Sequence, residues 1–155
     1  MKTALIAFLA LGFTTSAMAD GFNCYTQDGA YSVKVYNQTD ADAGTRNGAV
    51  MIISDNRVQY GRKTIAKFEA DNTLLNDDGA RYIGNVDLRY SNSNRAGENV
   101  LGTKLGQIDV MILDVDFNYS APMAHGEGIA GRVTVLKRNG AKIRAALACT
   151  RYLKN

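Results

Sequence analysis

The stretch GRVTVLKRNGAKIRAALACTRYLK, residues 131–154, decides the fold. Apolar and polar side chains alternate on both sides of Asn139-Gly140, which predicts a β-hairpin. A two-residue turn at these positions would mix the core and solvent faces. A three-residue loop, residues 138–140, with the glycine in the left-handed conformation, instead sets Val135 opposite Ile143 and keeps each face uniform. Because a one-residue slip turns every side chain to the opposite face, we predict the second register.

Export is predicted by the start of the chain, MKTALIAFLALGFTTSAMAD. Lys2 precedes an apolar run over residues 4–13, and Ala17-Met18-Ala19 supplies the small residues that a signal peptidase reads. The run is too short to span a membrane, which takes ~20 apolar residues. We expect a secretory signal over residues 1–19 and a periplasmic or extracellular location. No later stretch is apolar enough for a transmembrane segment.

The hairpin register turns Cys149 toward the core on the last strand. The only other cysteine, Cys24, lies on the inward face of a short strand predicted over residues 22–25. Two cysteines in an exported chain are paired more often than free. We therefore predict a Cys24–Cys149 disulfide that ties the first strand to the last. The two strands would lie side by side or face each other across the core.

Residues 20–155 are predicted to form one domain, since domains commonly have ~100–200 residues. The chain holds one proline and 15 glycines, and no long segment repeats its apolar residues with a helical period. Short alternating segments separated by turn residues predict an all-β fold. About eight to ten antiparallel strands fit either a β-sandwich or a small β-barrel. The alternation does not choose between these two.

Two segments depart from simple alternation. In the strand predicted over residues 107–119, the apolar parity changes between Ile112 and Leu113, which predicts a β-bulge or a sharp bend near that point. Residues 70–79 are predicted to form a loop, from which Leu74-Leu75 would reach the core.

Residues suited to catalysis are few. The single histidine, His125, lies in MAHGEG with no nucleophile motif around it. Asp114, Asp116 and Asn118 share one face of a predicted strand, but Ca²⁺ takes about six to eight oxygen ligands. A solvated strand face accounts for them without a metal. We therefore expect a non-enzymatic protein with no catalytic residue, metal or cofactor.

The overall charge is small, but the C-terminal segment is basic. Lys and Arg number 18 against 15 Asp and Glu, a formal net charge of +3, so no nucleic-acid binding is expected. The C-terminal segment would suit an anionic envelope component or an acidic partner. Alternatively, its cations guard the terminal strand against edge pairing. The residues of this candidate basic surface are Arg132, Lys137, Arg138, Lys142 and Arg144.

FNCYTQDGAYSVKVYNQ, residues 22–38, and DDGARYIGN, residues 77–85, resemble bacterial periplasmic inhibitors of C-type lysozyme. Members of that family are small β-barrels that open with an aromatic-x-Cys stretch. They carry a Ser-Gly-x-x-Tyr loop that helps engage the lysozyme active site. In this chain an aspartate replaces the serine, and the Trp-x-Lys-Gly segment of the family is missing. The resemblance implies a partner-contact loop containing Asp78, Gly79, Arg81 and Tyr82.

These features predict an exported β protein that binds a protein or a cell-envelope component. An inhibitor of a lysozyme-like hydrolase is the alternative. A lipid-carrying barrel is a further alternative, and it requires a hollow interior. No sequence feature identifies the partner or sets an oligomeric state.

Overall fold

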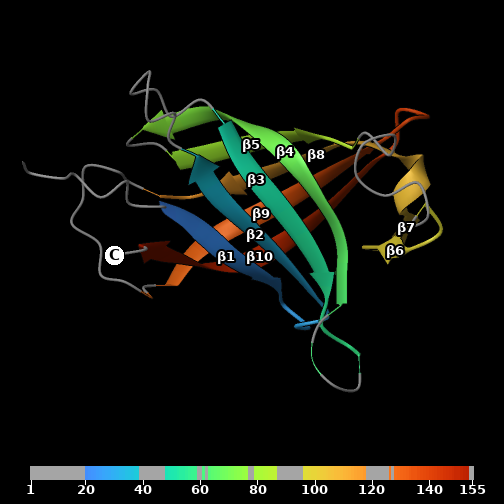
Figure 1. The fold of residues 1–155 in the computed structure, drawn as a ribbon, viewed down its shortest axis with the longest axis horizontal. Helices are drawn as coiled ribbons and strands as arrows, with labels where there is room; N and C mark the ends of the chain where they lie inside the picture. Colours follow the sequence, from blue (N-terminus) through green and yellow to red (C-terminus); the bar gives the residue numbers. More distant parts are fainter. Residues whose placement is uncertain are drawn as a thin grey trace, which may run out of the picture.

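The computed structural model describes residues 20–38, 48–58, 61, 63–76, 79–86, 96–117, 126 and 128–153. Eight antiparallel strands close into a barrel in the order β1-β10-β9-β8-β5-β4-β3-β2 (Figure 1). Alternation allowed a sandwich or a barrel, and the fold is the barrel. The barrel strands are β1 (Asp20–Thr26), β2 (Tyr31–Gln38), β3 (Gly48–Asp55), β4 (Lys63–Asn76), β5 (Gly79–Asn85), β8 (Ile108–Val115), β9 (Gly128–Lys137) and β10 (Lys142–Leu153).

One end of the barrel, called the turn end, carries the β1–β2 and β9–β10 turns. The connection from β5 to β8 at this end contains a small hairpin, β6 (Asn99–Val100) and β7 (Thr103–Lys104), and a 3-10 turn, η2 (Leu105–Gln107). Figure 1 shows these elements on the side of the barrel away from the C-terminus. Lys63 Nζ of β4 lies 2.5 Å from Glu98 Oε1, next to the hairpin. This ion pair ties the hairpin to the barrel wall.

Side chains fill the barrel interior. Alternate residues of each strand point inward, among them the fully buried Phe22, Met51, Tyr82 and Leu113. The Phe22 ring packs edge-to-face against Tyr82, with ring centroids 6.2 Å apart, and against Phe117, at 5.3 Å. An eight-stranded barrel is just wide enough for such side chains. A lipid carrier would need a hollow interior. The described residues instead pack the interior with side chains.

The C-terminal hairpin has the predicted register. Val135 pairs with Ile143, and the Lys137 amide donates to the Ala141 carbonyl across the loop, N to O 2.9 Å. Gly140 has a φ of 84°, the left-handed conformation that this loop requires.

Strands β1 and β10 lie side by side and close the barrel. Cys24 stands directly opposite Cys149 in their register, and the two form a disulfide that spans 125 positions of the sequence. Both cysteines are buried. The predicted pairing is confirmed, and the two strands are neighbours rather than facing each other across the core.

Two details of the predicted strands were wrong. The register shift in β8 lies between Ile108 and Val110, before the predicted bulge position. Ile112 is an outward, half-buried residue, because its cross-strand neighbours Ile83 and Thr134 cover it from both sides. The predicted loop over residues 70–79 is largely strand, since β4 pairs with β5 as far as Asn76.

Candidate functional site: a basic face on the barrel wall

Four adjacent strands, β5, β8, β9 and β10, bring charged residues together on the outside of the barrel. Inward and outward side chains alternate along a strand, so the neighbours of buried Tyr82 and Leu113 point outward. The register sets Arg81 opposite Asp114, and Asp114 opposite Arg132. Two parallel rows follow toward the turn end, Ile83-Ile112-Thr134-Arg144 and Asn85-Val110-Leu136-Lys142.

Asp114 lies between two arginines. Arg81 Nε is 2.5 Å from Asp114 Oδ1, and Arg132 Nη2 is 3.6 Å from Oδ2. One carboxylate does not neutralise two guanidinium groups, which are about half exposed. Lys142 and Arg144 on β10 add two cations for which the described residues provide no ion-pair partner. We call Arg81, Arg132, Lys142 and Arg144, with Asp114, the basic face.

Two shallow hollows flank the Arg81–Asp114–Arg132 row. The hollow nearer the turn end has a volume of about 290 Å³, and the described residues that line it include all four cations and one acid, Asp114. Apolar and hydroxyl side chains form its floor, namely Ile112, Thr134 and Leu136. The other hollow, of about 400 Å³, has two cations and gains a second acid, Asp116. Unbalanced positive charge is therefore concentrated in the hollow nearer the turn end.

Lys137 and Arg138 do not belong to this face. The Arg138 guanidinium donates to the Val86 carbonyl at 3.2 Å, and its Nη1 lies 3.4 Å from Asp109 Oδ1. These contacts close the turn end over the irregular start of β8. Lys137 ends β9 opposite Ile108. The structure thus brings together three of the five cations predicted for a basic surface.

The predicted partner-contact loop is a barrel strand in its described part. Gly79 through Tyr82 belong to β5, and Asp78 lies outside the described residues. Tyr82 is 0% exposed and packs against Phe22, so its side chain cannot touch a partner on the intact barrel. Gly79 is buried against β8, where a Cβ would lie 2.9 Å from the Val115 carbonyl oxygen. Among the described residues of this segment, Arg81 is the one with an exposed side chain, and it joins the basic face.

The described part of the chain contains no group of three His, Cys, Asp or Glu side chains placed to hold a metal ion. The same residues include no helix long and apolar enough to span a membrane. His125, the candidate catalytic histidine, and Asn118, a candidate calcium ligand, lie outside the described residues.

No family model, curated protein or solved structure matches this chain.

Proposed function

We propose that this chain is an exported, non-enzymatic binding protein that holds an anionic protein or cell-envelope component on its basic face. The observation that carries the proposal is the convergence of four cations from β5, β9 and β10 on one hollow, where Asp114 is the one acid among the described lining residues. A buried disulfide is compatible with the oxidising compartment that the predicted signal would deliver the chain to.

Protection of a sheet edge does not account for the whole face. Lys and Arg often guard unpaired strands against aggregation. However, β5 and β9 have a barrel neighbour on each side, and Arg81 and Arg132 lie within paired stretches of those strands. Edge protection therefore does not explain Arg81 and Arg132, and the paired strands of the barrel hold both residues at fixed positions on the face.

Charge reversal on the face tests the proposal. We expect the protein to bind an anionic envelope fraction with an affinity that falls steeply as salt is raised. An Arg132→Glu/Arg144→Glu variant should bind at least about tenfold more weakly, because attraction becomes repulsion. Lys67→Glu, one charge reversal at an exposed position of β4 outside the face, is the control and should bind like the unchanged protein. Equal binding by all three proteins would refute the role of the face.

Inhibition of a lysozyme-like hydrolase is the alternative, and Arg81 is the observation that favours it. It comes from the segment that resembles the inhibitor family, and it is half exposed. Glycoside hydrolases act through a pair of carboxyl groups, which a guanidinium complements. This alternative predicts micromolar inhibition of lysozymes that is lost in Arg81→Ala. Absence of inhibition across lysozymes of different structural types would remove it.

A further inference from the structure

Strand β10 extends beyond its neighbour β1 at the turn end. The last pair between them is Thr26 with Leu147, whereas β10 begins at Lys142. β1 ends there because its chain turns away. Asp28 Oδ1 accepts hydrogen bonds from the Thr26 hydroxyl at 2.5 Å and from the Ala30 amide at 3.0 Å. In the part of the chain that the structure describes, residues 142–146 of β10 therefore have β9 on one side and no strand on the other.

The free side of this segment presents unpaired backbone groups. The Lys137 amide bonds to the Ala141 carbonyl, and pairing with β9 continues from there without a register shift. In an antiparallel ladder, alternate residues bond to the same neighbour, so Ile143 and Ala145 bond to β9. Arg144 and Ala146 then direct their N–H and C=O groups to the free side. Among the described residues, none bonds to these four groups.

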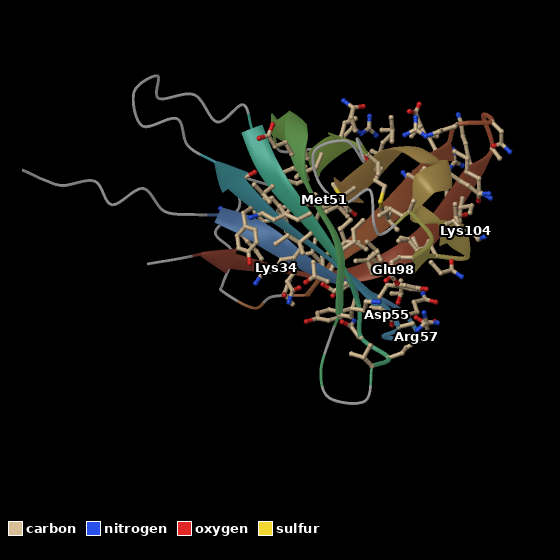
Figure 2. All side chains as sticks on the ribbon, turned by 45° about the vertical axis from the view of Figure 1, so that its right-hand side comes forward. Lys34, Met51, Asp55, Arg57, Glu98 and Lys104 are labelled. Atoms are coloured by element: carbon tan, nitrogen blue, oxygen red, sulfur yellow. A yellow bond between two sulfur atoms is a disulfide. The ribbon has the colours of Figure 1, made fainter. Side chains whose placement is uncertain are left out.

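An open cleft lies along this free edge. Its volume is about 660 Å³, within the ~300–1,000 Å³ range of ligand sites. Residues 143–146 form one wall, and the β1–β2 turn with Tyr31 and Arg57 forms the other. Leu101 of the β6–β7 hairpin lines it at the turn end. Figure 2 labels Arg57 at this end of the barrel, beside Asp55. We call this the edge cleft.

We propose that the edge cleft binds an extended, acidic segment of another protein, which adds to β10 as a further strand. Only an extended chain offers donors and acceptors at the spacing of the Arg144 and Ala146 groups. A residue opposite Arg144 points outward beside this unpaired cation and is acidic. The next residue, opposite Ala145, points inward and is apolar, because Ile143, Ala145 and Leu101 pack there against the core.

Pairing with a second copy of the chain is disfavoured by the same charges. An antiparallel pair that uses the whole free edge of both copies sets Arg144 directly opposite Arg144. Like charges at directly opposed positions destabilise a sheet. An acidic strand turns this repulsion into attraction.

The test uses a synthetic probe, the alternating peptide Glu-Val-Glu-Val-Glu-Val-Glu, and the variant Ala146→Pro. Proline removes the N–H that faces the cleft and leaves the β9 ladder and every charge unchanged. We expect about tenfold weaker peptide binding by Ala146→Pro, whereas Ala146→Thr, which keeps the N–H, should bind like the unchanged protein. Because the basic face is intact in both variants, this loss separates the edge cleft from charge attraction elsewhere.

Amide hydrogen exchange gives an independent readout on the unmodified protein. Saturating peptide should slow exchange of the Arg144 and Ala146 amides, and a peptide N-methylated at every second residue, on the amides that face β10, should not. Unchanged exchange at both amides, or equal peptide binding by Ala146→Pro, would overturn the proposal. A concentration-dependent dimer that Ala146→Pro abolishes would overturn it in favour of a second copy.

Discussion

Gly131 of β9 leaves the space that the disulfide occupies. A Cβ on this residue would lie 2.5 Å from Cys149 Sγ and 3.2 Å from the Asp114 carbonyl oxygen. Neither atom moves easily, since the sulfur is bonded to Cys24 and the oxygen belongs to a paired strand. The glycine is therefore required by close packing rather than by an unusual φ.

Gly131→Ala should lower the free energy of unfolding by about 1–3 kcal/mol, the usual cost of overpacking a core. Urea titration of the disulfide-bonded protein measures it. Gly128→Ala on the same strand is the matched control, because a Cβ there meets nothing within 4 Å. If both variants lost the same unfolding free energy, strand propensity and not the contact with the sulfur would account for the loss in Gly131→Ala.

Asp55 and Arg57 form the best-defined ion pair at the turn end. Arg57 Nε lies 3.0 Å from Asp55 Oδ1, and Nη2 lies 2.8 Å from Oδ2. Hydrogen bonds from the Arg57 side chain lower the pKa of Asp55 to about 2. The Tyr31 hydroxyl also accepts from Nη2 at 2.7 Å, so the pair braces one wall of the edge cleft.

A depressed carboxyl pKa stabilises the fold above the unfolded pKa of ~3.9, and the gain is lost as pH falls toward about 2. Asp55→Asn should therefore lower Tm at pH 7, by a few degrees at most because the pair is partly exposed. The difference from the unchanged protein should shrink between pH 4 and pH 2. Thermal melts across this range measure it, with exposed Glu69→Gln as control. A difference that is constant with pH would contradict the assignment.

At the scale of elements, local patterns were predictable and non-local pairings were not. The β9–β10 hairpin follows from its own residues, since one register keeps Val135 and Ile143 on the core face. The β8 irregularity was misplaced because Ile112 is apolar yet points outward, covered by side chains of β5 and β9. Alternation alone does not distinguish such covered positions from core positions.

The residues of the basic face were likewise predictable from local sequence only in part. The cations of β9 and β10 are near one another in sequence, so the hairpin register places them on one surface. Arg81 joins them only because β5 pairs with β8 and β8 with β9, which no local signal predicts. The burial of Tyr82 was not predictable either: the family resemblance of residues 77–85 placed it in a partner-contact loop, whereas its burial depends on packing against Phe22 of the distant strand β1.

At the scale of the whole molecule, the barrel is closed by the pairing of strand β1 with strand β10. The β1–β10 seam pairs residues up to 133 positions apart, from Asp20 with Leu153 to Thr26 with Leu147. Such long-range pairing is entropically costly to form, because the whole intervening loop must close. The disulfide lies within this seam and limits how far its strands separate in the unfolded chain.

Removal of both sulfurs should therefore weaken the entire barrel. In Cys24→Ala/Cys149→Ala we expect unfolding free energy to fall by about 2–5 kcal/mol, with a larger urea m-value from a more expanded unfolded chain. Reductant should destabilise the unchanged protein and leave the double variant unaffected. If the double variant were as stable as the oxidised, unchanged protein, a structural role for the disulfide would be contradicted.

The same variant links the seam to Gly131 through a double-mutant cycle. If the sulfur is what excludes a Cβ at position 131, Gly131→Ala should cost much less in the cysteine-free barrel than in the disulfide-bonded one. The coupling between the two changes should then account for most of the single-variant loss. A Gly131→Ala cost that persists unchanged without the sulfurs would assign the constraint to the Asp114 carbonyl and the β8–β9 ladder instead.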